Sequence, residues 1–134
     1  MYREVTEKLI EWKNKANRKP LLMTGVRQCG KTYIIKEFAQ ENFKNFIYIN
    51  FEESEKLSAI FDYDYDVHRI VHELEQHLKT KIVAGDTCVF MDEIQECPRA
   101  ITALKYFCEN MRELLLICAG SLLGVAIREK QISF

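Results

Sequence analysis

The chain has 134 residues, 48% of them hydrophobic, and a formal net charge of −1. This length suits a single domain with a core of its own, and the hydrophobic share excludes an intrinsically disordered chain. The near-neutral charge provides no basic field for nucleic acid, so nucleic-acid binding is not supported.

The cysteines predict where the protein resides. There are five, an odd number, and they occur singly with no CxxC pair and no zinc-ligand spacing. Three lie in apolar stretches, where a free thiol behaves as a small hydrophobic group, so we expect a reducing, cytoplasmic location. Charged residues from Arg3 onward predict no signal peptide, and the most apolar stretch, 114–127, is too short to span a membrane.

Apolar residues recur first at helical spacing and then in short continuous runs, in alternation along the whole chain. The helical spacing predicts helices over 2 to about 17, 31–43, 67 to about 82, and from 98 onward. The apolar runs predict strands over 20–24, 46–51, 87–91 and 114–119. Continuous apolar strands that alternate with helices indicate an α/β fold, with a parallel sheet covered by helices on both faces.

The segment from Gly25 to Thr32 reads GVRQCGKT and matches the phosphate-loop (Walker A) pattern G-x-x-x-x-G-K-[ST] in full. It lies between an expected strand and an expected helix, where backbone N–H groups and the start of the helix face an anion. We expect Lys31 to reach the β- and γ-phosphates of ATP and the Thr32 hydroxyl to bind Mg²⁺. The predicted nucleotide-binding residues are Gly25, Val26, Arg27, Gln28, Cys29, Gly30, Lys31, Thr32 and Tyr33.

Two carboxylates, Asp92 and Glu93, directly follow the third apolar run. Alone this is a weak pattern, because surface carboxylates commonly cap the end of a strand. After a phosphate loop it predicts the second half of a P-loop site, in which Asp92 holds magnesium through water. Glu93 is then expected to orient and polarise the attacking water.

Ser121 follows the fourth apolar run. Two interpretations remain open for its hydroxyl. It could sense the γ-phosphate or the attacking water, or it could cap the following helix.

Three aspartates at 62, 64 and 66 have the spacing that opens a calcium-binding loop. Val67 stands where such a loop requires glycine for its sharp turn, so calcium is disfavoured. We expect Asp66 to cap the helix that begins at Val67. His68 and His72 share one face of that helix, but the face is polar, and we interpret it as solvated.

With these motifs in place, the chain resembles a large family of bacterial and archaeal AAA-superfamily P-loop ATPases over 18–134. The resemblance rests on five segments: the phosphate loop, Tyr48-Ile49-Asn50-Phe51-Glu52, Asp92-Glu93-Ile94-Gln95 with Cys97-Pro98, Leu104-Lys105-Tyr106, and Gly120-Ser121-Leu122-Leu123-Gly124. It implies a three-layer sandwich with strand order 5-1-4-3-2 and ATP as the ligand. It also implies a longer protein, with a fifth strand, a helical lid and a nuclease-like C-terminal domain. Residues 1–134 would then be a single AAA-type domain, incomplete at its C-terminus.

The leading hypothesis is an ATPase domain that uses Lys31, Thr32, Asp92, Glu93 and Ser121. One alternative is a nucleotide-binding fragment or switch module that does not hydrolyse ATP. A P-loop small-molecule kinase is disfavoured, because Glu93 suits water activation and no lid for an acceptor is visible. In the implied strand order the first strand lacks its fifth-strand neighbour, so we expect self-association or a partner chain at that sheet edge.

Overall fold

The structure is a computed structural model that describes residues 2–14, 20–25 and 31–121. Within these residues four strands form one parallel sheet in the order β1-β4-β3-β2. The strands are β1 (Leu21–Gly25), β2 (Asn45–Asn50), β3 (Thr87–Asp92) and β4 (Leu115–Ser121). The α/β class, the parallel sheet and the expected 1-4-3-2 order are confirmed.

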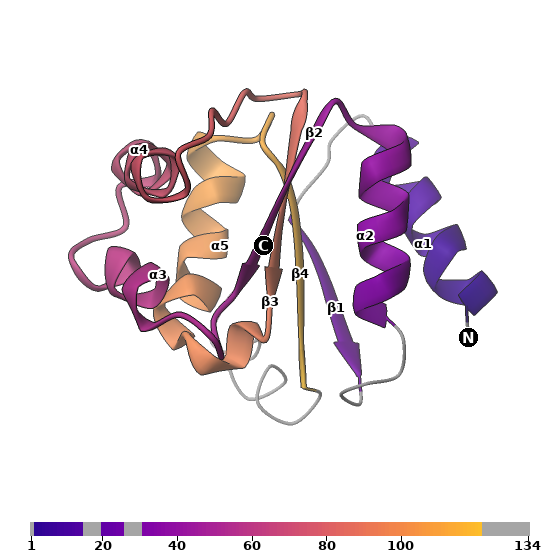
Figure 1. The fold of residues 1–134 in the computed structure, drawn as a ribbon, viewed down its shortest axis with the longest axis horizontal. Helices are drawn as coiled ribbons and strands as arrows, with labels where there is room; N and C mark the ends of the chain where they lie inside the picture. The colour runs from indigo at the N-terminus through magenta and orange to yellow at the C-terminus, as the bar shows by residue number, and fades with distance from the viewer. Residues whose placement is uncertain (1, 15–19, 26–30, 122–134) are drawn as a thin grey trace.

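Helices cover both faces of the sheet, which makes three layers (Figure 1). One face carries α1 (Tyr2–Asn14) and α2 (Lys31–Asn42), and the other carries α3 (Glu55–Ala59), α4 (Val67–Leu78) and α5 (Pro98–Asn110). Two 3₁₀ turns, η1 (Ile60–Asp62) and η2 (Ile94–Glu96), complete the described elements. Each face has its own core, because parallel strands are buried on both sides.

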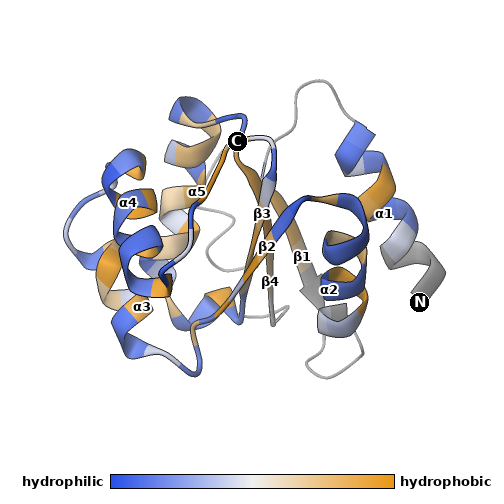
Figure 2. Cartoon of the chain, turned by 45° about the horizontal axis from the view of Figure 1, so that its top comes forward, coloured by the Kyte–Doolittle hydropathy of each residue, from blue (hydrophilic) through white to orange (hydrophobic). Residues whose placement is uncertain are grey.

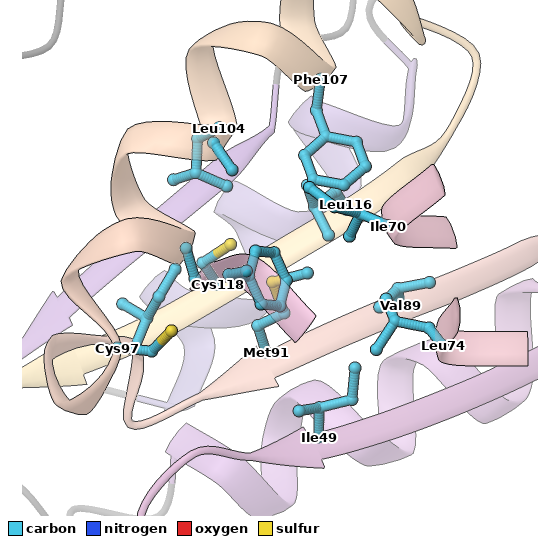
Figure 3. Close-up of a cluster of buried hydrophobic side chains, with 14 of the residues drawn as sticks. Ile49, Ile70, Leu74, Val89, Met91, Cys97, Leu104, Phe107, Leu116 and Cys118 are labelled. Carbon is cyan, nitrogen blue, oxygen red and sulfur yellow. The ribbon is translucent and has the colours of Figure 1, made fainter. Parts of the chain in front are cut away.

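Alternation along β3 divides its side chains between the two cores. Cys88 and Phe90 point to the α2 side, where they pack with residues of α1 and α2. Val89 and Met91 point to the opposite side, where α4 and α5 supply further apolar side chains (Figure 3). The helices mix hydrophilic and hydrophobic stretches, whereas the strands are mainly hydrophobic along their middle (Figure 2). This is the pattern that amphipathic helices on a buried sheet require.

The helix expected to reach residue 82 is four residues shorter, because α4 ends at Leu78. Lys79 adopts a left-handed conformation with φ of 53° and donates its N–H to the Glu75 carbonyl, which closes the helix. The Glu75 carboxylate accepts the N–H of Ile82 at 2.8 Å, so the chain beyond the helix is held by a side chain. At the other end Asp66 caps α4 as expected, accepting the N–H groups of His68 and Arg69.

Sequence patterns did not predict α3, η1 or η2. Ser54 begins α3 by accepting the N–H of Leu57, whose side chain is buried. A helix of five residues is too short to show a helical period, so only the packing of Leu57 and the cap reveal it. The expected strand and helix ends otherwise differ from the observed ones by one or two residues, and 15–19, where the first helix was expected to end, lie outside the described part.

Candidate functional site

The predicted site residues that the structure describes lie at the carboxyl edge of the sheet, where β1, β3 and β4 end and α2 begins (Figure 1). Strand register brings the ends together: Gly25 pairs with Ser121 across β1 and β4, and Asn50 pairs with Asp92 across β2 and β3. Ligands of open parallel sheets bind at this edge.

Thr32, on the first turn of α2, contacts Asp92 at the end of β3. Its Oγ1 donates a hydrogen bond to Asp92 Oδ2 over 2.9 Å. Asp92 is buried, with 7% of its surface exposed. The residue that ends the phosphate-loop pattern and the first residue of the acidic pair are therefore in direct contact.

Asp92 accepts two further hydrogen bonds. The Tyr48 hydroxyl donates to Oδ2 over 2.7 Å, and the backbone N–H of Glu93 donates to Oδ1 over 2.9 Å. Several donors on one carboxylate fix the orientation of its plane. Asp92 thus presents an oriented carboxylate rather than a freely rotating one.

Tyr48 is itself held from several directions. Asn50 Nδ2 donates to the Tyr48 hydroxyl over 3.2 Å, and Lys36 Nζ lies 3.7 Å from the centroid of the Tyr48 ring. Burial, together with the hydrogen bond to Asp92 and the negative charge of Asp92, raises the pKa of Tyr48 well above its usual value. The phenol therefore stays protonated and acts as a hydrogen-bond donor.

Glu93 has a left-handed backbone, with φ of 52° and ψ of 45°. Residues other than glycine rarely adopt this conformation, and it is often found at functional sites. It turns the chain from β3 into η2, which carries Gln95. Gln95 Nε2 donates to Glu93 Oε1 over 2.9 Å, so one oxygen of the Glu93 carboxylate is engaged by a neighbouring amide.

The other predicted residues are placed as follows. Gly25 ends β1, Lys31 begins α2 and Ser121 ends β4, all at the same sheet edge. The predicted residues of the loop itself lie outside the described part, namely Val26, Arg27, Gln28, Cys29 and Gly30. Tyr33 lies on α2 with 68% of its surface exposed, and its contact with nucleotide stays a prediction.

The oxygen atoms at this edge fit a magnesium ion chemically. Thr32 supplies a hydroxyl and Asp92 a carboxylate in contact with it. Among the described residues no group of three or more His, Cys, Asp or Glu side chains could hold a metal by themselves. Mg²⁺ is usually bound in proteins through one or two carboxylates together with water and substrate phosphate.

Sequence patterns missed Tyr48, Asn50, Lys36 and Gln95 as members of the site. Tyr48 and Asn50 were noted only as part of the segment that resembles the ATPase family. The signal that could have found them is the period of two along β2, which puts both side chains on the face that carries Phe90 and Asp92 in the paired strand. Lys36 is four residues after Thr32 and shares its face of α2.

A sequence model of the family described as "AAA domain" matches residues 17–133. The chain belongs to this family. Comparison with curated proteins gives no match. The AAA domain assignment agrees with the parallel sheet and its strand order, and with the phosphate-loop sequence pattern that starts at the end of β1. It indicates a nucleotide-binding, ATPase-like domain. No helix in the described part of this AAA domain combines the length and the apolar character needed to cross a membrane.

Proposed function

We propose that this domain binds ATP with Mg²⁺ and hydrolyses the bond between the β- and γ-phosphates, as the ATPase module of a larger machine or switch. The observation that carries this proposal is the 2.9 Å contact between Thr32 and Asp92, with Glu93 next in the chain. It joins the end of the phosphate-loop pattern to the acidic pair at the edge where the strands end.

In this proposal some residues position the metal and the phosphates, and another accepts a proton from water. Thr32 and Asp92 would hold Mg²⁺, which would neutralise negative charge on the phosphates. Lys31, the first residue of α2, would pair with the same phosphates. Glu93 would accept a proton from the water that attacks the γ-phosphorus, while the bond to the β-phosphate oxygen breaks and ADP leaves.

Ser121 ends β4 beside Gly25, in register with the strand that leads into the loop. This position supports the proposal that its hydroxyl senses the γ-phosphate or the attacking water. Ser121 lies at the end of β4, next to the end of β1, and phosphate is expected to bind at this edge of the sheet.

A second candidate is a nucleotide-binding switch that does not hydrolyse ATP. The contact that favours it is the hydrogen bond from Gln95 to Glu93, which engages the carboxylate proposed as the base. A measurement of phosphate release distinguishes the two functions, because binding without release indicates the switch.

The binding site is tested with Lys31→Ala. Titration calorimetry with ATP and Mg²⁺ should show binding to the wild type and none to the variant, because the substitution deletes the lysine of the phosphate loop. Lys56→Ala, at an exposed position on α3 across the sheet, is the matched control and should bind like the wild type. Unchanged affinity in Lys31→Ala would refute the site assignment.

A further inference from the structure

We propose that Tyr48 is a positioning residue for Asp92, and that its hydroxyl sets the affinity of the site for the Mg²⁺–nucleotide complex. This inference rests on the proposed nucleotide site. Tyr48 lies on β2, outside both the phosphate loop and the acidic pair.

The hydrogen bonds to Asp92 divide its two oxygens. Oδ2 accepts both side-chain hydroxyls, from Thr32 at 2.9 Å and from Tyr48 at 2.7 Å, whereas Oδ1 accepts the Glu93 N–H. Two hydroxyls on one oxygen fix the rotation of the carboxylate about its last bond. The Tyr48 bond is the shorter of the two, and its length lies within the range of a hydroxyl that donates to a charged carboxylate.

Two contacts hold the Tyr48 ring. Lys36 Nζ lies 3.7 Å from the ring centroid, and the Phe90 ring packs on Tyr48 edge to face with centroids 5.4 Å apart. Phe90 precedes Asp92 by two residues on the same face of β3, so the ring rests on the strand whose carboxylate it holds. The Lys36 cation over the Tyr48 ring and the aromatic contact with Phe90 together restrict the orientation of the Tyr48 side chain.

A chain of donors leads to the carboxylate. The N–H of Glu52 donates to Asn50 Oδ1, Asn50 Nδ2 donates to the Tyr48 hydroxyl, and Tyr48 donates to Asp92. Consecutive hydrogen bonds polarise one another, which strengthens the last donation to the charged group.

Lys36 connects this arrangement to the phosphate loop. It follows Thr32 by four residues on α2, so one face of the helix contributes both the Asp92 partner and the cation over Tyr48. The start of α2, β2 and the end of β3 are thereby joined at one carboxylate. A role in packing alone would require the ring of Tyr48 but not its hydroxyl.

The variant Tyr48→Phe separates these two roles, because it keeps the ring and removes only the hydroxyl. Binding of a non-hydrolysable ATP analogue is measured by calorimetry with Mg²⁺ and again with EDTA, and Mn²⁺ binding in the presence of ADP is followed by electron paramagnetic resonance. Loss of a group that orients a metal ligand weakens metal affinity about 10–100-fold. We expect a loss of about tenfold with Mg²⁺ or Mn²⁺ and unchanged affinity in EDTA.

The matched control is Tyr65→Phe, the same chemical change in a tyrosine that stacks on Tyr106 of α5, on the opposite side of the sheet. It should bind like the wild type under all conditions. Thermal melting is recorded for each variant. If Tyr48→Phe proves unfolded, Asn50→Ala replaces it, since this change keeps Tyr48 and its packing and should produce a smaller, several-fold loss confined to the metal-dependent binding.

The outcomes separate the inference from the proposed function. Wild-type protein that shows no binding improved by Mg²⁺ would refute the proposed function and the inference together. Wild-type binding that Tyr48→Phe matches, or a variant that loses equal affinity with Mg²⁺ and with EDTA, would refute the inference alone. A loss confined to the metal-dependent binding establishes Tyr48 as a positioning residue.

Discussion

Thr32 and Asp92 are 60 residues apart in the sequence, and a hydrogen bond of 2.9 Å joins their side chains. Thr32 lies at the start of α2 and Asp92 at the end of β3. The parallel arrangement makes this contact possible, because it brings every strand end and the start of α2 to one edge of the sheet.

Asp92→Asn should weaken the magnesium-dependent part of ATP binding about tenfold or more, because the substitution removes the negative charge but keeps the shape. Calorimetry with and without Mg²⁺ measures the difference. Asp62→Asn, at a position with 69% of its side chain exposed, is the control and should match the wild type. Equal affinity of Asp92→Asn and wild type for ATP with Mg²⁺ would show that Asp92 does not serve the metal.

Glu93→Gln should bind ATP with nearly wild-type affinity and release no phosphate, because the amide keeps the shape of the side chain but cannot accept the proton of water. Phosphate release under multiple-turnover conditions is the measurement. Glu96→Gln, on an exposed residue of η2, should hydrolyse ATP at the wild-type rate. If Glu93→Gln and Asp92→Asn lost ATP binding to the same extent, the division of roles between the two carboxylates would be wrong.

Stability at alkaline pH should depend on Tyr48. Its pKa is raised in the folded protein, so between its ordinary pKa of about 10 and the higher folded value the unfolded chain has lost a proton that the native state keeps. This contribution to stability is complete below pH 10 and is lost as the pH rises through that interval. Urea unfolding at pH 8, 9, 10 and 11 should therefore show a steeper decline for the wild type than for Tyr48→Phe.

The buried thiols add a decline that both proteins share. Burial raises the pKa of Cys88 to about 12 and raises that of Cys118 as well, and neither is altered by the substitution. Parallel curves for wild type and Tyr48→Phe would mean that Tyr48 ionises at the same pH in the folded and unfolded states.

Phe107→Ala should reduce the free energy of unfolding by about 3–5 kcal/mol. Phe107 is 1% exposed on α5 and belongs to the core between α5, α4 and the sheet (Figure 3). Val83→Ala, at a position that is 43% exposed, should change stability by less than about 0.5 kcal/mol. A small loss for Phe107→Ala would indicate that the core refills the cavity.

The edge of the sheet at β1 should bind another strand. Among the described strands, β1 pairs only with β4, and an edge strand offers N–H and C=O groups for further pairing. If the protein self-associates at this edge, we expect light scattering to show a mass that rises with protein concentration. If a partner chain occupies the edge in its place, we expect a stable complex with that chain. A constant monomer mass over a wide concentration range would contradict self-association at this edge.

The sequence by itself determined the order of strands and helices, the phosphate-loop pattern and the position of Asp92 and Glu93 at a strand end. These features are local: a run of apolar residues, a helical period or an eight-residue motif needs only neighbours in the chain. The same patterns predicted a parallel sheet, whereas the strand order 1-4-3-2 was predicted from the family resemblance.

Only the tertiary structure decided that Tyr48 belongs to the site. In an apolar strand a tyrosine looks like a core residue, and its role depends on Asp92, 44 residues later, which the register of β2 on β3 brings to hydrogen-bond distance. The same holds for the end of α4, where the left-handed turn at Lys79 and the Glu75 carboxylate outweigh the helical spacing that continues beyond it. A period of two assigns a side chain to one face of a strand but does not identify its hydrogen-bond partner, so the partner follows from packing and strand register.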